Sequence, residues 1–215
     1  MAKPHIDEHQ TFGQYRKRNR TDYIIVHCAA SQNKQEYDWK FIDRVHRSNG
    51  WLGIGYHFVI RTDGTIQNGR GLDDLGSHVA GYNDCSIGIC LIGGLTKDGK
   101  PTNNFTAHQL SSLKELIDWL KEDHYPNAKI IGHCDVPGVN KSCPCFNVAE
   151  WYNGFVSIPA PDPIPDPVHV YTVAAGDTLY GISRKTDVTI QELIDINGIQ
   201  NPDTIFPGQL LRLRR

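Results

Sequence analysis

The chain of 215 residues has no long hydrophobic run, and none of its apolar stretches approaches the ~18 residues that a membrane-spanning helix needs. The amino terminus, Met1 to Glu8, also lacks the apolar core of a secretory signal peptide. Both absences argue against an integral membrane protein. We therefore expect a chain that is made in the cytoplasm and has no membrane partner.

Charge of one sign is not in excess either. The formal net charge is −2 at pH 7 and the sequence pI is about 6.5, whereas nucleic-acid-binding domains usually carry a strongly basic surface. One local basic run spans residues 16–20, and a run of this kind is more often solvated than bound to a ligand. The composition therefore predicts no nucleic-acid partner.

Paired Cys-x-x-Cys spacing, which is typical of structural zinc sites, does not occur in the sequence. The six cysteines are irregularly spaced, which argues against the disulfide framework of a small secreted protein. We expect reduced thiols, with Cys28 and Cys90 as small buried hydrophobic side chains. Cys134 and Cys145 could compete for a metal ion. The alternative is an exported protein with disulfides among Cys134, Cys143 and Cys145.

Changes in composition mark the domain boundaries. Residues 157–168 contain five prolines, so they cannot form a helix or a central strand and are predicted to be an extended linker. Residues 1–20 are polar, lack periodicity and are predicted to be an N-terminal arm. This leaves a first domain at residues 21–156 and a small second domain at residues 169–215.

Hydrophobic patterns in the first domain alternate between strands and helices. Apolar runs predict strands, and amphipathic stretches that begin with capping residues predict helices. In chain order we expect strands at 22–27, 55–60, 86–91 and 130–131, a hairpin turn at 62–65, and helices at 38–49, 106–124 and 147–154. This order predicts an α/β fold with a mixed central sheet flanked by helices. The second domain is predicted to be βααβ, with no cluster of catalytic residues.

The predicted strand 22–27 ends in His27, and the strand 130–131 runs through Gly132 into His133, so both side chains are expected at strand ends, where they face a cleft. Ten residues after His133, Cys143 offers a thiolate. Catalytic zinc typically has three protein ligands and keeps its fourth position for water. The sequence therefore predicts Zn²⁺ on His27, His133 and Cys143. Lys141, two residues before Cys143 on extended backbone, adds a cation to the same face.

Several motifs carry a family resemblance. Residues 21–155 resemble the zinc-dependent N-acetylmuramoyl-L-alanine amidases of the short phage lysozyme type, which are related in fold to peptidoglycan recognition proteins. The matching motifs, in the family's order, are Ile25-Val26-His27-Cys28-Ala29-Ala30, Gly50-Trp51-Leu52 with Gly55-Tyr56-His57-Phe58, Asp63-Gly64-Thr65, Gly76-Ser77-His78, Gly81-Tyr82-Asn83 with Ser86-Ile87-Gly88, Asn104-Phe105-Thr106 and Lys141-Ser142-Cys143-Pro144. Together they span most of the domain.

The resemblance implies an endolysin, a hydrolase that cleaves the peptidoglycan amide bond between N-acetylmuramic acid and the L-alanine of the stem peptide. Such an enzyme stays in the host cytoplasm until it is released to the cell wall. The resemblance places zinc on the same three residues that the spacing predicts, and it gives catalytic roles to Tyr56 and Lys141. The alternatives are a buried core tyrosine and a solvated loop lysine. No carboxylate base is obvious, so the proton-transfer group is not assigned.

His57 and His78 lie in matched motifs but are not needed as metal ligands. They are predicted to bind substrate or to contact a metal ligand, with structural packing as the alternative.

Residues 169–215 resemble a LysM module. The matching motifs are Tyr171-Thr172-Val173, Gly176-Asp177-Thr178-Leu179, Ile182, Asn197 and Pro207-Gly208-Gln209. Such modules bind glycan that contains N-acetylglucosamine, so the resemblance implies a tether to the same cell wall. By the family pattern the glycan contacts come from Gly176, Asp177, Thr178, Leu179 and Ile205. Asp177 and Thr178 could instead cap a helix.

The sequence departs from the family pattern in two places. The segment from His133 to Cys143 is slightly longer than in the short phage enzymes, with Gly138-Val139 as the extra residues, and those enzymes lack a LysM tail. Some of them also inhibit the phage RNA polymerase, partly through the amino-terminal arm. Residues 1–20 carry no motif for this role, so polymerase binding is kept as an alternative. A second alternative is a non-catalytic wall-binding protein, in which loss of a zinc ligand is expected, whereas all three are present here.

Overall fold

The computed structural model describes residues 3–8, 15–155, 170–174, 176–186, 188–199, 201, 205–206 and 208–213. The chain divides into two compact units, Met1–Pro159 and Ala160–Arg215. The predicted proline-rich linker, residues 157–168, lies outside the described residues.

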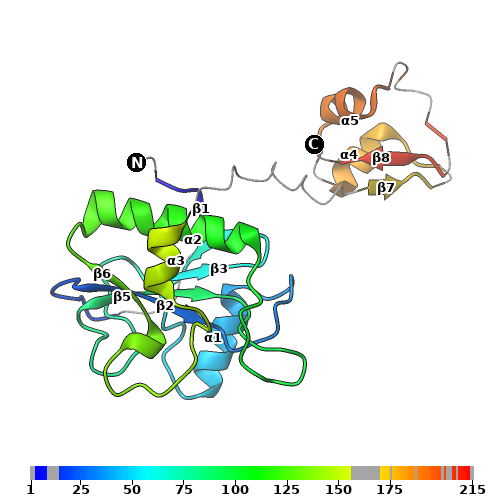
Figure 1. Ribbon diagram of the computed structural model, residues 1–215. Helices are drawn as coiled ribbons and strands as arrows, with labels where there is room; N and C mark the ends of the chain where they lie inside the picture. Colours follow the sequence, from blue (N-terminus) through cyan, green and yellow to red (C-terminus); the bar gives the residue numbers. More distant parts are fainter. Residues whose placement is uncertain are drawn as a thin grey trace. The chain divides into compact units, whose positions relative to one another are not determined.

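The first unit is built on a six-stranded sheet with the order β1-β4-β3-β5-β2-β6 (Figure 1). The strands are β1 Ile6–Asp7, β2 Tyr23–Cys28, β3 Phe58–Ile60, β4 Ile66–Asn68, β5 Ser86–Leu91 and β6 Lys129–Gly132. Strand β4 runs antiparallel to β3, and all other neighbours are parallel. The predicted mixed sheet is therefore confirmed. The predicted hairpin turn joins β3 to β4, where Gly64 has a φ of +88° that a glycine adopts without strain.

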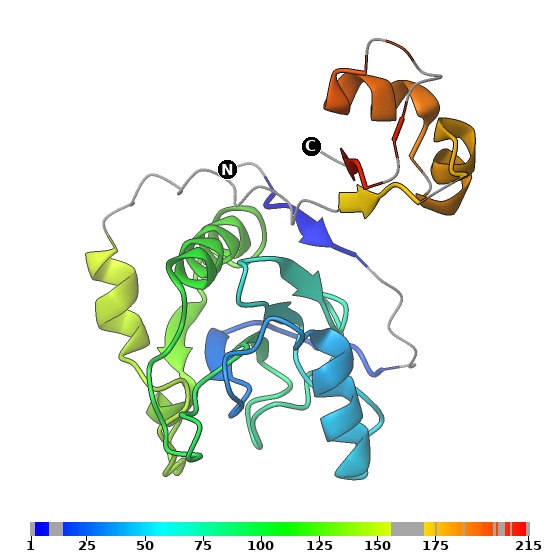
Figure 2. The same cartoon turned by 90° about the vertical axis from the view of Figure 1, so that its right-hand side faces the viewer.

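Helices cover both faces of this sheet, as Figures 1 and 2 show. Helix α1, Trp39–Ser48, begins at Asp38, whose side chain accepts a hydrogen bond from the Phe41 N–H. Helix α2, Ala107–Trp119, begins at the predicted capping box of Thr106 and Gln109 and continues into a π-helical turn, Leu120–His124. Helix α3 spans Val148–Gly154. The predicted helices are therefore present, with the last turn of the longest one widened.

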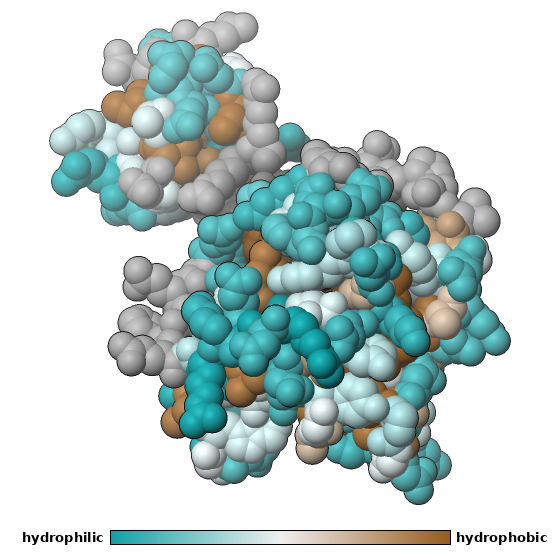
Figure 3. Space-filling model, turned by 90° about the vertical axis from the view of Figure 1, so that its left-hand side faces the viewer, coloured by the Kyte–Doolittle hydropathy of each residue, from teal (hydrophilic) through white to brown (hydrophobic). Residues whose placement is uncertain are grey.

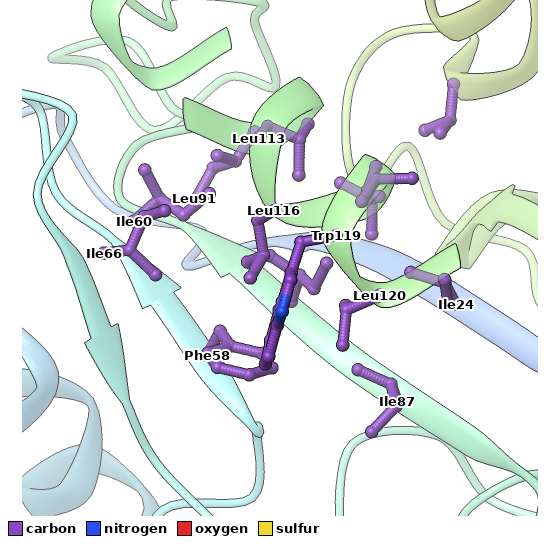
Figure 4. Packing of buried hydrophobic residues seen from close by; sticks show 14 of the residues in the cluster. Ile24, Phe58, Ile60, Ile66, Ile87, Leu91, Leu113, Leu116, Trp119 and Leu120 are labelled. Carbon is purple, nitrogen blue, oxygen red and sulfur yellow. The ribbon is translucent and has the colours of Figure 1, made fainter. Parts of the chain in front are cut away.

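The main hydrophobic core lies between the sheet and helices α2 and α3. Figure 4 shows the side chains of Phe58, Ile60, Ile66, Ile87 and Leu91 from the sheet packed against Leu113, Leu116, Trp119 and Leu120. In β2 the side chains of Ile24 and Val26 join this core, whereas that of Ile25 packs on the other face. Because strand side chains alternate, His27 also points to the face opposite α2.

One predicted strand is shorter than expected. Alternation along the predicted strand 55–60 puts Tyr56 on the same face as Phe58 and Ile60, but β3 begins only at Phe58. Tyr56 packs instead in the cluster of Val59 on the α1 side of the sheet. The reason is that the carbonyl groups of Gly55 and Tyr56 accept hydrogen bonds from the N–H groups of Ser77 and Arg70, so this stretch pairs with a loop and leaves the strand alternation.

Parts of the predicted N-terminal arm pack on the first unit. Strand β1 pairs with β4 and forms one edge of the sheet. Further along, the Arg18 guanidinium donates hydrogen bonds to the carbonyl groups of Leu72 and Asp74 and to the Tyr125 hydroxyl. These contacts tie the segment before β2 to the loop that follows β4.

The second unit has the predicted βααβ order (Figure 1). Its elements are β7 Val170–Thr172, α4 Leu179–Thr186, α5 Ile190–Asn197 and β8 Leu210–Arg212. Strands β7 and β8 pair antiparallel, and a small core centred on Leu179, Ile182 and Leu193 packs against them.

Hydrophilic residues predominate on the face of the molecule that Figure 3 displays. Among the described residues, we find no helix with both the length and the hydrophobicity needed to cross a membrane.

Candidate metal centre and active site

The three predicted metal ligands come together at one edge of the sheet. Strands β2 and β6 are parallel neighbours in which Val26 pairs with Gly132, so His27 and His133 follow at the same level. His133 is the first residue of a short 3₁₀ turn, His133–Asp135. The loop after this turn returns to the site because the Cys134 N–H donates a 2.7 Å hydrogen bond to the Cys143 carbonyl. Cys143 is thereby brought beside His27.

The ligand atoms of His27, His133 and Cys143 all lie within 4.8 Å of one another. The Cys143 Sγ is 3.9 Å from the His27 Nδ1, and the two histidine ring centroids are 4.5 Å apart. Ordinary Zn–S and Zn–N bond lengths set sulfur and nitrogen about 3.6 Å apart at a tetrahedral angle. Two imidazoles and one thiol at this separation fit a zinc ion with an open fourth position.

Both histidines are held in the neutral form that binds metals. Burial lowers the pKa of His27 well below its usual value, and the neighbouring His133 and Lys141 lower it further. Burial and Lys141 also lower the pKa of His133. The hydrogen bond with the Cys28 side chain, followed by burial, raises the pKa of the Cys143 thiol, so a nearby cation is needed before it ionises at neutral pH. The Cys28 N–H donates to the Cys143 Sγ at 3.2 Å and orients the sulfur.

Tyr56 and Lys141 lie beside these residues. The Tyr56 ring centroid is 5.1 Å from that of His27. Burial and the neighbouring thiols of Cys90, Cys143 and Cys28 raise the pKa of Tyr56 well above its usual value, so its hydroxyl keeps its proton. Lys141 is exposed and lines a cavity of about 590 Å³ together with His133 and His78. This cavity is the cleft predicted at the strand ends.

His57 and His78 occupy different positions. His57 is 0% exposed, its Nδ1 accepts a hydrogen bond from the Gly88 N–H, and its Nε2 contacts the Asp74 carbonyl and Arg18. Because the side chain is fully buried and does not line the cavity, the predicted substrate contact does not fit its position, which favours the alternative of structural packing. His78 is 8% exposed and lines the cavity, and its Nδ1 lies 3.0 Å from the His27 Nε2.

The burial of His57 predicts a pH-dependent stability. Burial, followed by the Arg18 charge, lowers its pKa to about 3, whereas an unfolded chain takes up this proton near pH 6.5. The unfolded state therefore binds the additional proton, and the free energy of unfolding falls as the pH drops from about 6.5 toward 3. His57→Gln should flatten this slope by about 1.4 kcal/mol per pH unit. Urea unfolding at pH 7, 6, 5 and 4 measures both slopes, and equal slopes would contradict the expectation.

In the second unit, the residues predicted to contact glycan have mostly structural contacts. Asp177 accepts hydrogen bonds from the Tyr171 hydroxyl, the Ala174 N–H and Lys185, and Thr178 caps α4 through the Gly181 N–H. The Leu179 side chain is 4% exposed and belongs to the core, so its predicted glycan contact does not fit. Gly176 occupies the turn between β7 and α4 with a φ of +87°, and Ile205, before β8, is half-buried.

Two residues of the cleft are not among the predicted site residues. Trp51, which is 42% exposed and rests on the His46 ring, lines the cavity, as does Asn83. Both residues lie in the matched motifs, so the motifs were an available signal. The hydrogen bond between His27 and His78 had no signal in the sequence, because the two residues are 51 positions apart.

All six cysteines are free thiols. The structure therefore agrees with the expected reduced state and has none of the alternative disulfides among Cys134, Cys143 and Cys145.

Comparison with known proteins places this geometry in context. A family model described as N-acetylmuramoyl-L-alanine amidase matches residues 17–146, and a LysM domain model matches residues 171–214. The endolysin of Enterobacteria phage K11 is 43% identical over 138 residues, which cover 64% of this chain and 89% of the relative. The endolysin of Klebsiella phage KP32 is 42% identical over 139 residues, which cover 65% of this chain and 90% of the relative.

Solved structures of related proteins are similar to the first unit as well. The endolysin N-acetylmuramoyl-L-alanine amidase LysCS from Clostridium intestinale superposes with a TM-score of 0.57 at 30% identity and covers 68% of this chain and 90% of its own. The Drosophila recognition protein PGRP-LB superposes with a TM-score of 0.55 at 28% identity, covering 71% of this chain and 90% of its own. The fold of the first unit is thus shared with hydrolases and with recognition proteins.

Proposed function

This chain belongs to the N-acetylmuramoyl-L-alanine amidase family and is a peptidoglycan hydrolase of the endolysin type, and from this premise we propose that its reaction depends on Zn²⁺ held by His27, His133 and Cys143. The observation that carries the proposal is the convergence of the three ligand atoms within 4.8 Å. The scissile bond is the amide between N-acetylmuramic acid and the L-alanine of the stem peptide.

His27, His133 and Cys143 would hold the zinc ion, which would supply Lewis-acid chemistry for polarising the scissile carbonyl and activating water. The protein side chains supply the rest. Tyr56 keeps its proton because of burial, so its hydroxyl acts as a hydrogen-bond donor to the oxygen on which charge develops. Lys141 brings a positive charge to the same cleft and favours this developing charge. His27 and His133 are neutral at the operating pH and therefore remain available as ligands.

The second unit supplies attachment. We assign it the binding of cell-wall glycan that contains N-acetylglucosamine, which is supported by its match to the LysM family. The loop at Gly176 and the residues near Ile205 remain the candidate contacts, together with the exposed aromatic side chains of Tyr180 and Phe206. Tethering raises the concentration of the amidase near its substrate. The endolysin relatives support action at the bacterial cell wall after release from the host cytoplasm.

The test is digestion of purified peptidoglycan by the zinc-loaded chain, followed by mass analysis of the released products. We expect free stem peptides that begin with L-alanine. A chelator should abolish their release, and added zinc should restore it. Intact muramyl peptides in every sample, with the protein still pelleting with the wall, would instead establish the alternative of a non-catalytic wall-binding protein. The comparisons give no support to the alternative of RNA polymerase inhibition.

A further inference from the structure

We propose that His78 is a positioning residue that fixes the orientation of His27 for metal binding, an inference that rests on the proposed zinc site. The His27 Nε2 lies 3.0 Å from the His78 Nδ1. The His78 Nε2 lies 3.4 Å from the Ser86 Oγ, and the Ser86 hydroxyl donates to the Tyr82 carbonyl at 2.6 Å. The contacts form one continuous chain from the ligand to the backbone.

With zinc on the His27 Nδ1, the direction of each hydrogen bond in this chain follows. The His27 Nδ1 faces the Cys143 sulfur, so it is the ligand atom, and Nε2 must carry the proton of the neutral ring. His78 then accepts at Nδ1, carries its own proton on Nε2 and donates to Ser86. Ser86 in turn donates to a carbonyl, which can only accept. Each group has a single role, so the chain fixes one tautomer for both rings.

A neutral acceptor differs from the usual partner of a metal-binding histidine. Such histidines commonly donate their second N–H to a carboxylate, a carbonyl or water. A carboxylate would add a negative charge beside the ligand set, whereas His78 adds none. Two imidazoles and one thiolate on Zn²⁺ keep a net charge of about +1, which favours a strong Lewis acid.

Packing holds the His78 ring in place. A Cβ atom at Gly76 would lie 2.5 Å from the His78 Cδ2, and one at Gly88 would lie 2.7 Å from its ring. Side chains at either position would therefore displace the ring. The backbone N–H of His78 also donates to the Asn83 Oδ1 at 2.8 Å. The His57 ring meets the His78 ring edge-on, with their centroids 5.8 Å apart. His78 has one available position, with one edge toward the cleft.

Substrate binding is a weaker explanation for His78. The side chain lines the cavity, but both of its ring nitrogens already have protein partners. A substrate group would have to displace His27 or Ser86 in order to contact a ring nitrogen. The geometry therefore favours a role that acts through His27.

Two substitutions separate the contacts of His78 in the full-length chain. In His78→Asn the Oδ1 takes the place of the Nδ1, so the acceptor for His27 is kept and the contact with Ser86 is lost. In His78→Gln the terminal amide reaches the place of the Nε2, so the contact with Ser86 is kept and the acceptor for His27 is lost. We expect His78→Gln to weaken zinc affinity about 10- to 100-fold, and His78→Asn to change it by less than about 3-fold.

Zinc affinity is measured by competition with a chromogenic chelator, and the ligand field is measured from the visible spectrum of the Co²⁺-substituted protein. His78→Asn should keep the wild-type spectrum and His78→Gln should shift it. Urea unfolding of the metal-free proteins gives the structural cost of each substitution. Equal zinc affinity in both variants, or losses that simply follow their unfolding free energies, would overturn the inference.

A wild-type chain that binds no zinc would overturn the proposed metal site and this inference with it. If the wild type binds zinc and His78→Gln does not fold, His78→Ala removes the acceptor for His27 with a smaller side chain. Zinc binding weaker than that of His78→Asn is then expected, and equal binding in these two variants would overturn the inference alone.

Discussion

Replacing Cys143 with serine is expected to abolish both zinc binding and amidase activity. The Cys143 sulfur is the only thiol in the ligand set and lies 3.9 Å from the His27 Nδ1. A metal that polarises a carbonyl contributes several kcal/mol to the transition state, so its loss lowers kcat/KM by about 1,000-fold or more. Release of stem peptides from purified peptidoglycan measures the activity, and metal analysis after gel filtration measures the bound zinc.

The matched control is Cys145→Ser, two residues along the same loop. The Cys145 thiol contacts the Gly94 carbonyl and lies outside the ligand set. This variant should keep one zinc per chain and most of its activity. Two results would count against the assignment of Cys143: full zinc content in Cys143→Ser, or equal loss of zinc in the two variants.

Replacing Tyr56 with phenylalanine is expected to lower kcat about 100- to 1,000-fold while zinc content and wall binding stay unchanged. The substitution removes only the hydroxyl, which burial and the neighbouring thiols keep protonated. Loss of one hydrogen-bond donor to a developing oxyanion typically costs this factor. Steady-state kinetics on a soluble muramyl peptide would separate kcat from KM.

Tyr37→Phe is the control for this prediction, because the Tyr37 ring stacks on Phe41 of α1 and belongs to the same hydrophobic cluster as Tyr56. Its kinetics should match those of the wild type. Wild-type kcat in Tyr56→Phe would exclude the hydroxyl from the reaction. A loss of zinc in Tyr56→Phe would show that the residue supports the ligands and takes no part in the chemistry.

The positions of the candidate metal ligands could be predicted from the sequence because they depend on local sequence patterns. An apolar strand that ends in histidine predicts a ligand at a strand end, and two such strands in a parallel sheet bring their carboxyl ends to one edge. The register confirms the consequence, since Val26 pairs with Gly132 and the two histidines follow. Cys143 was predicted from its residue type and spacing, and the structure brings its sulfur to the same edge.

Other features of the site depend on contacts between distant segments. Strand alternation placed Tyr56 with Phe58, but hydrogen bonds from Arg70 and Ser77 remove residues 55 and 56 from the strand and direct Tyr56 toward His27. Similarly, His57 and His78 come from two similar motifs. Only packing decides that His57 is closed off beside Arg18, whereas His78 reaches His27.

The sequence by itself determined the α/β sheet, the helix caps, the βααβ unit and the residue types of the metal site, because each follows from hydrophobic period, capping chemistry or ligand spacing over a few residues. Tertiary structure alone decided which histidine supports a ligand, which face Tyr56 occupies and that Leu179 is a core side chain. The physical reason is that these outcomes depend on hydrogen bonds and close packing between residues far apart in the chain, such as the approach of His78 to Gly88.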